Sequence, residues 1–352
     1  MINTSASEWV FINRSYRQGE NVLWNHLEDI LAFGRKCLIV TDGFVYQMLG
    51  EQLCKKLMEL GGEIFVWVVE QEKPIGAFDS VVALGGGRAI DLGKALAFES
   101  NCPVVVVPTS ASTDAPTSRI SVKYREGYFE KYSYYTKSPD LVLVDTAILI
   151  NSPVHFLTAG IADGLSTSIE ARTVRENRGV NTLGALPTLA AEAIAEKCRD
   201  VLLVYAEEAV EANKLKKISP AFEAVIEANT LLSGIGFESG GLSIAHALHN
   251  AMVSLWGGEI KGSHGQIIAL TTLQQLRIEG REEEFTQYQA LFEKLELPLT
   301  YEALSIFPSA NELKKVTELA FSPEDGIVRS QSPATKENVF QALLAFRKTR
   351  EI

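Results

Sequence analysis

The first half of the chain alternates short apolar runs with stretches in which apolar residues recur at helical spacing. The apolar runs predict buried strands at residues 36–41, 63–69, 80–84, 104–107 and 141–145. The helical spacing predicts helices over residues 44–60 and 88–99. Continuous apolar strands separated by helices are typical of a parallel sheet that is covered on both faces. Residues 119–135 differ, because they carry alternating aromatic residues around a glycine and so predict a hairpin.

Beyond about residue 150 the pattern changes to long stretches rich in Ala, Leu and Glu, such as 189–212 and 221–232. Apolar residues there recur at helical spacing. We therefore predict two domains, an α/β domain over residues 1–152 and an all-helical domain over residues 153–352. The total length of 352 residues agrees with two domains of about 150 residues each.

One connection in the α/β half is unusually short. Only eight residues separate Val69, at the end of one predicted strand, from Phe78, just before the next. A crossover between parallel strands normally needs roughly 10–12 residues. We therefore expect a modified sheet edge at residues 70–77.

Composition narrows the class of partners and the compartment. The formal charge is 33 − 44 = −11, which disfavours nucleic acid and anionic membranes because both would repel the chain. No apolar run approaches the roughly 20 residues that span a bilayer, and the N-terminus has no signal-peptide core. The cysteines lie far apart, with no C-x-x-C pair: Cys37, Cys54, Cys102 and Cys198. This usage predicts a reduced cytoplasmic protein with buried thiols.

A glycine-rich turn joins the predicted strand 80–84 to the helix that follows it. Gly85, Gly86 and Gly87 would let the backbone approach a ligand closely, and the free N–H groups of the helix start would favour a phosphate. A tight turn without a ligand is the alternative. Asp42, at the end of the first strand, either accepts hydrogen bonds from an adenosine ribose, which favours NAD over NADP, or caps the following helix.

A second loop, residues 108–118, follows the strand 104–107. Six of its eleven residues carry a hydroxyl group. Ligands of open α/β sheets collect at the carboxyl ends of the strands, where this loop lies. We expect it to hold a diphosphate or a nicotinamide, with Asp114 orienting a substrate hydroxyl, and a polar surface loop is the alternative.

Histidine is scarce and clustered. Three of the five histidines, His246, His249 and His264, fall within 19 residues, and the first two lie on a helix predicted over residues 237–250. Asp163 is flanked by glycine in an otherwise apolar helical stretch. One Asp and two His with open coordination positions suit a catalytic Zn²⁺ or Fe²⁺. A satisfied core aspartate with structural or surface histidines is the alternative.

Taken together, these stretches resemble one known family. The matching segments are residues 85–95, 108–124, 139–163, 236–250 and 263–265. They resemble the glycerol dehydrogenase branch of the iron-containing (group III) alcohol dehydrogenases, and the runs 112–118 and 236–242 are specific to that branch. The resemblance implies a Rossmann-like α/β domain followed by an all-α domain, the architecture shared with dehydroquinate synthase, whose motifs are not matched.

The resemblance also implies the residues of the site. It implies one divalent metal bound by Asp163, His246 and His264. It implies an NAD site formed by Asp42, Gly86, Gly87, Arg88, Asp91, Thr109, Ser112, Ser118, Ile120 and Tyr124. Asp114 would contact a polyol, and His249 would lie beside the ligands or in the substrate pocket. Thr167 stands four positions after Asp163, where the true iron enzymes carry a histidine, and this difference favours zinc over iron.

The implied reaction is the NAD-dependent oxidation of a small polyol, glycerol to dihydroxyacetone, by metal-assisted hydride transfer, in a homo-oligomer. Three alternatives remain at this point. A phosphorylated polyol such as glycerol 1-phosphate would suit Arg119 and Lys123, whose charges could bind a phosphate. A 2-hydroxy acid would also need such a cation. A binding protein without turnover would keep the cofactor fold alone.

Overall fold

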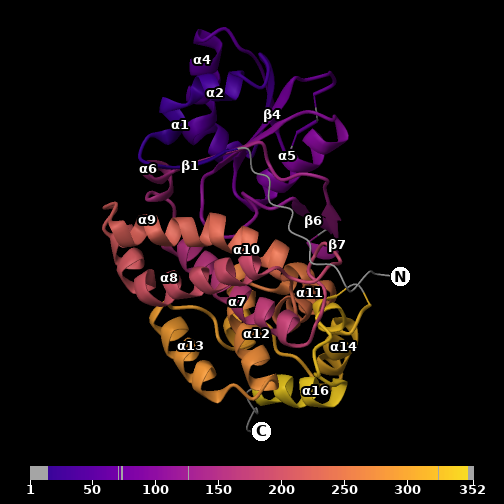
Figure 1. The fold of residues 1–352 in the computed structure, drawn as a ribbon. Coiled ribbons are helices and arrows are strands. Elements are labelled where there is room, and N and C mark those ends of the chain that lie inside the picture. Colours follow the sequence, from indigo (N-terminus) through magenta and orange to yellow (C-terminus); the bar gives the residue numbers. More distant parts are fainter. Residues whose placement is uncertain (1–14, 70, 73, 126, 324, 348–352) are drawn as a thin grey trace.

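The computed structural model describes residues 15–347 except 70, 73, 126 and 324. A sheet with its helices forms one end of the molecule, and a body of helices forms the other (Figure 1). The six strands of the sheet are all parallel, in the order β1-β8-β5-β4-β2-β3. Their bounds are β1 Ser15–Gly19, β2 Lys36–Thr41, β3 Glu63–Val68, β4 Ser80–Gly85, β5 Val104–Pro108 and β8 Leu141–Asp145. The predicted fold class is confirmed.

The central strands are buried on both faces, as their continuous apolar runs predict. Side chains of one parity, such as Ile39 and Leu84, pack under the helices α1 (Val22–Asn25), α2 (Leu27–Leu31) and α4 (Glu51–Glu59). Side chains of the other parity, such as Val40 and Ala83, pack against α5 (Gly87–Glu99) and the helical body. Short elements complete this half: α3 Gly43–Val45, a π-helical turn η1 Tyr46–Gly50 and α6 Thr146–Leu149.

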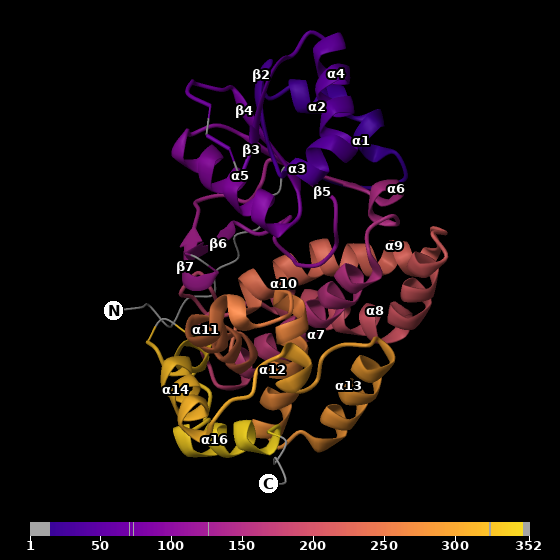
Figure 2. The ribbon, with the colours of Figure 1, turned by 180° about the vertical axis from the view of Figure 1, so that it is seen from behind.

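The helical body is organised around α7 (Val154–Glu176), which is buried along most of its length. The longer helices around it are α8 Leu189–Lys214, α9 Pro220–Glu227, α10 Ser233–Gly240, α11 Ile244–Trp256, α12 His264–Ile278, α13 Glu282–Lys294, α14 Ala310–Ala320 and α16 Lys336–Ala345. Shorter turns are η2 Ala228–Leu232, η3 Gly257–Glu259, η4 Glu302–Leu304 and α15 Gly326–Arg329. Figure 2 shows α7 and α12 side by side at the centre of this body. One apolar core runs from the sheet through α5 into α7, α8 and α12, so the two halves pack as one body.

The predicted hairpin is present as the antiparallel pair β6 (Ile120–Arg125) and β7 (Tyr128–Tyr134). It lies between the sheet and the helical body (Figure 1). The connection between β3 and β4, where we expected a modified sheet edge, contains no helix among its described residues. No helix in the described part of the chain is both long and apolar enough to cross a bilayer.

Two features differ from the predictions. The continuous helix predicted over residues 237–250 is wrong, because α10 ends at Gly240 and α11 begins at Ile244. Gly241 between them has a φ of +100°, which few residues other than glycine adopt, so the chain turns here. The strand β1 was not predicted, since Ser-Tyr-Arg-Gln-Gly has no apolar run and becomes a strand only by pairing with β8 at the sheet edge.

Candidate metal and cofactor site

Three side chains from three helices converge at the centre of the helical body. Asp163 comes from α7, His246 from α11, and His264 is the first residue of α12. One ligand atom from each lies within 4.8 Å of the other two. The Oδ1 atom of Asp163 is 3.3 Å from Nε2 of His264 and 3.7 Å from Nε2 of His246. The structure therefore brings together the three residues that the sequence suggested as metal ligands.

Close helix packing makes this convergence possible. A Cβ atom on Gly265, next to His264, would come within 2.1 Å of the carbonyl oxygen of Ala159 on α7. A Cβ atom on Gly160 would come within 1.9 Å of the Ala111 carbonyl of the second loop. Glycine at both positions lets α12 and the loop approach α7 directly, which places His264 and the loop beside Asp163.

The donor set fits a divalent metal. Asp163 is 1% exposed, yet neither of its carboxylate oxygens accepts a well-formed hydrogen bond from the described residues. A buried carboxylate without partners is costly unless another group compensates its charge. One carboxylate oxygen and two imidazole nitrogens around a common point are a donor set that Zn²⁺ and Fe²⁺ accept, with further positions left for substrate.

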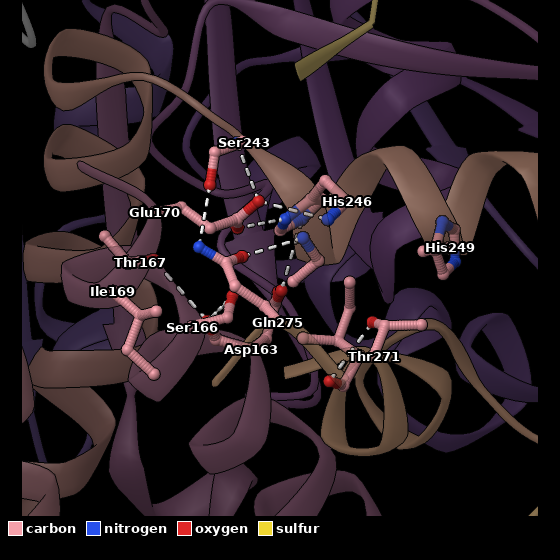
Figure 3. Close-up of polar contacts among 12 residues, drawn as sticks. Asp163, Ser166, Thr167, Ile169, Glu170, Ser243, His246, His249, Thr271 and Gln275 are labelled. Carbon is pink, nitrogen blue, oxygen red and sulfur yellow. Dashed lines mark hydrogen bonds and ion pairs between the residues drawn. The ribbon is translucent and has the colours of Figure 1, made fainter. Parts of the chain in front are cut away.

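Glu170 was not predicted from the sequence, although it organises this cluster. It lies seven residues after Asp163, two turns along the same face of α7, and it is fully buried. Its Oε2 is 2.5 Å from Nδ1 of His246, and its Oε1 accepts the backbone N–H groups of Ser243 and His246 at 2.8 and 3.0 Å (Figure 3). Glu170 thus orients the His246 ring and caps the start of α11. The signal was a second acidic residue at helical spacing in an apolar helix.

The charges of the cluster act on one another. Burial by itself would raise the pKa of Asp163, but the rings of His264 and His246 outweigh burial and hold it below its ordinary value. Burial by itself would lower the pKa of His246, but the Glu170 carboxylate raises it to about 9. His249 has no such carboxylate, and burial with the neighbouring rings holds its pKa well below the ordinary value. Nε2 of His249 faces Nδ1 of His264 at 2.9 Å.

Asp114 lies beside the cluster on the second loop. Its Oδ2 accepts a hydrogen bond of 2.9 Å from Ser233, whose hydroxyl is also 2.9 Å from that of Thr167. Burial, and then the charge of Asp163, raise the pKa of Asp114 well above its ordinary value. Thr167, one turn after Asp163, has its hydroxyl beside that of Ser233 and offers no nitrogen donor to the cluster.

A single cleft of about 1020 Å³ connects these groups with the glycine turn and the hairpin. Eight of the residues predicted for the site line it: Gly87, Arg88, Asp91, Asp114, Ser118, Ile120, His246 and His264. Asp42, Gly86, Thr109 and Ser112 do not line it directly. Gly86 lies against the second loop, since a Cβ atom on it would stand 3.5 Å from the Ser110 hydroxyl. Gly87 lies against the same loop as well as lining the cleft, since a Cβ atom on it would stand 3.4 Å from the Thr113 hydroxyl. Tyr124 lies on β6, and its side chain falls outside the described part of the chain.

Asp42 caps the helix that follows it, with Oδ1 accepting the N–H of Val45 at 2.9 Å. Its Oδ2 remains turned toward the glycine turn, because a Cβ atom on Gly85 would lie 3.6 Å from it. The capping role and a contact with a bound ribose are therefore compatible. The first is in the structure, and the second stays a prediction.

Lys94, two turns into α5, is buried and holds the second loop. Its ammonium donates to the carbonyl oxygens of Ala115 at 2.9 Å and Ser118 at 3.3 Å, and to that of Ile120. It also lies 3.2 Å from Asp91, whose other oxygen accepts the N–H of Val122. The lysine is structural rather than exposed, and Asp91 joins the glycine-turn helix to the hairpin.

Arg119 pairs with Glu238 instead of facing a ligand. Its Nε lies 3.2 Å from the Glu238 carboxylate, which also accepts the Arg119 backbone N–H at 2.8 Å. Glu238 is 3% exposed. The partner lies 119 residues away in the sequence, so no local pattern indicated this pair.

Known proteins resemble this chain in sequence and in fold. Residues 13–146 match the iron-containing alcohol dehydrogenase family. A glycerol dehydrogenase of Thermotoga maritima is 36% identical over 94% of this chain and 94% of its own length, and a glycolaldehyde reductase of Halobacterium salinarum is 37% identical over the same shares. The crystal structure of glycerol dehydrogenase from Schizosaccharomyces pombe has a TM-score of 0.91 at 31% identity, covering 97% of this chain and 91% of that one. The family predicted from the motifs is thereby confirmed: the chain belongs to the glycerol dehydrogenase branch of the iron-containing alcohol dehydrogenases and is an oxidoreductase.

Proposed function

We propose that this protein oxidises a secondary alcohol of a small polyol, glycerol to dihydroxyacetone, with NAD⁺ and one divalent metal. The observation that carries the proposal is the buried carboxylate of Asp163, which accepts no hydrogen bond from the described residues and faces His246 and His264. Both histidines line the cleft that also contains Asp114 and the glycine turn. The name of the Thermotoga maritima relative supports glycerol as the substrate. In this proposal residues 1–152 bind the nucleotide and residues 153–352 bind the metal.

The residues of the cleft have distinct tasks in this reaction. Asp163, His246 and His264 would hold the metal, which when bound supplies a Lewis acid that lowers the pKa of the substrate alcohol. Asp114 would orient a neighbouring hydroxyl, since it lies beside the cluster and lines the cleft. The N–H groups at the start of α5 would bind the NAD diphosphate, as helix N-termini favour anions. A bound nicotinamide would supply the hydride acceptor, and the residues of the cleft would supply orientation.

We propose zinc rather than iron as the metal. The support is the number of donors, because Thr167 turns its hydroxyl to Ser233 and adds no fourth protein ligand. Three protein ligands with an open position are the arrangement of catalytic zinc sites. We also expect a homo-oligomer in the cytoplasm. The four free and buried thiols agree with a reducing compartment.

The test is the variant Asp163→Ala, with Asp200→Ala, an exposed aspartate on α8, as the matched control. Metal content is measured by elemental analysis, and turnover by NADH absorbance with glycerol and NAD⁺. We expect Asp163→Ala to bind no metal and to be inactive, and the control to match the wild type. An Asp163→Ala protein that is fully active without metal would refute the proposal.

The charges weaken the phosphorylated-substrate alternative. Arg119, the predicted phosphate anchor, is engaged by Glu238 within the fold. Lys123 still lines the cleft, so inorganic phosphate and glycerol 1-phosphate belong in the inhibition assay. The glycolaldehyde reductase relative supports one further candidate, the reduction of a small hydroxyaldehyde by NADH, which is the same hydride transfer run in reverse. A panel of polyols and hydroxyaldehydes assayed in both directions ranks the two.

A further inference from the structure

The two histidines of the cluster have different partners behind them. His246 turns Nδ1 to the buried carboxylate of Glu170. His264 turns Nδ1 to the ring of His249, at 2.9 Å from its Nε2. A chain of polar groups continues from there: Nδ1 of His249 is 3.1 Å from Oδ1 of Asn250, and Nδ2 of Asn250 donates to the Tyr132 hydroxyl at 3.0 Å. His264 is thus connected through two side chains of α11 to the hairpin strand β7.

The directions of the hydrogen bonds that join His264, His249 and Asn250 follow from the two ends of this series. If His264 offers Nε2 to the metal, its Nδ1 carries the proton and donates to Nε2 of His249. Since Nε2 of His249 accepts this proton, the ring carries its own proton on Nδ1 and donates it to Oδ1 of Asn250.

The contact between Asn250 and Asp325 gives an independent test of this assignment. Asp325 accepts a hydrogen bond of 2.9 Å from Nδ2 of Asn250. A carboxylate is an acceptor, so the nitrogen of the Asn250 amide has to face Asp325 and the oxygen has to face His249. The orientation of the amide is therefore fixed independently of the histidines, and it agrees with the tautomers required at the metal end.

We propose that His249, Asn250 and Tyr132 form a positioning chain that fixes the tautomer and the ring orientation of His264, and that couples this ligand to the β6–β7 hairpin. The proposal rests on the proposed metal ligation by His264. Tyr132 couples His264 and the hairpin, because it is the hairpin residue that these hydrogen bonds reach and it also lines the cleft, together with Lys123 and Glu130. Whatever displaces the hairpin therefore changes the support of a metal ligand.

The experiment measures the metal directly. Metal is removed from the full-length protein, and Co²⁺ is titrated back against a competing chelator while its visible absorption spectrum is recorded. The variants are His249→Leu, which removes both contacts of the ring, His249→Gln, whose amide oxygen still accepts from Nδ1 of His264, and Tyr132→Phe. The phenylalanine keeps the aromatic packing on Phe129, with ring centroids 5.1 Å apart in the wild type. Tyr128→Phe is the control, because it removes an exposed hydroxyl from the same strand.

We expect His249→Leu to bind Co²⁺ about 10- to 100-fold more weakly, the usual effect of losing a group that orients a metal-bound histidine. His249→Gln should recover part of this loss. Tyr132→Phe should weaken binding several-fold and shift the Co²⁺ spectrum, while Tyr128→Phe should match the wild type.

Two results would overturn the proposal. One is Tyr132→Phe with wild-type affinity and spectrum, and the other is His249→Gln binding no better than His249→Leu. Circular dichroism and the unfolding temperature show whether each variant is folded. If the wild type itself binds no Co²⁺ at Asp163, the proposed function fails first, so the two failures are distinguishable.

Discussion

Replacing Lys94 by methionine tests how the second loop is held beside the metal cluster. The lysine is 2% exposed, and its ammonium serves three carbonyl oxygens of the loop and the carboxylate of Asp91 at 3.2 Å. Methionine has a similar length but no charge, so it leaves Asp91 buried without its cation. Removing one partner of a buried ion pair costs about 3–5 kcal/mol. We expect Lys94→Met to lose a free energy of unfolding in that range.

The double variant Asp91→Asn/Lys94→Met separates the lost charge from the lost loop contacts. It replaces the ion pair by two neutral side chains of similar size, which is often far less costly than leaving one charge alone. We therefore expect the double variant to be more stable than Lys94→Met. The control is Lys294→Met, because Lys294 pairs with Glu207 at the surface and such pairs contribute about 1 kcal/mol or less.

The assay is urea unfolding followed by tryptophan fluorescence, together with steady-state kinetics. The loop carries Asp114 and Ser118, so Lys94→Met should also raise the KM for NAD⁺. The argument is refuted if Lys94→Met loses no more stability than Lys294→Met, or if the double variant is as unstable as Lys94→Met.

Two further predictions concern pH and the metal. Burial raises the pKa of Glu238 to about 7, although the backbone N–H and the guanidinium of Arg119 oppose it. Because this folded pKa exceeds the ordinary 4.5, the carboxylate lowers stability as the pH rises from about 4.5 to 7, by at most about 3 kcal/mol, and unfolding at pH 5 and pH 8 should show a drop that Glu238→Gln lacks. Equal drops in both proteins would contradict this. Removing the metal should lower the unfolding temperature and restoring it should reverse the loss, since a ligand at 100 times its Kd adds about 2.7 kcal/mol; an unchanged unfolding temperature would count against the metal site.

The elements that the sequence predicted well are those whose environment is uniform along their length. The strands β2, β4, β5 and β8 are buried on both faces, and an unbroken apolar run reports that directly. β1 is only half-buried and polar, so its strand conformation depends on β8, which lies more than 120 residues later. The turn at Gly241 could not be separated from a helix by apolar spacing, because the residues on both sides of it are buried.

The residues of the site also differ in how far the sequence could predict them. Asp163 and Asp114 stand in distinctive local sequences, so motifs indicated them before the structure placed them together. The partners behind the site had no local signal, because Tyr132 and Asn250 meet across 118 residues. Glu170 was also missed, although its spacing of seven residues from Asp163 on one helix face is a local signal that could have indicated it.

The connection between β3 and β4 is short for a parallel crossover, and its length bears on the shape of the cleft. The path from the end of β3 to the start of β4 runs back along a whole strand, roughly 20 Å at about 3.3 Å per residue. By the observed bounds eleven residues, 69–79, join the two strands, and those that the structure describes form no helix. Phe78, near the end of this connection, packs edge-on against Phe65 of β3, at 5.3 Å between ring centroids.

An extended loop covers less of a sheet face than a helix does. Parallel crossovers are right-handed, and the β3–β4 and β4–β5 connections run in the same direction across the sheet, so a helix at residues 70–77 would lie beside α5. Without that helix, the cleft continues from the metal cluster past the glycine turn and along α5, where Trp67, Leu92 and Leu96 line it. The lack of a helix among the described residues of 69–79 thus leaves this part of α5 free to line the cleft, at the end away from the metal cluster.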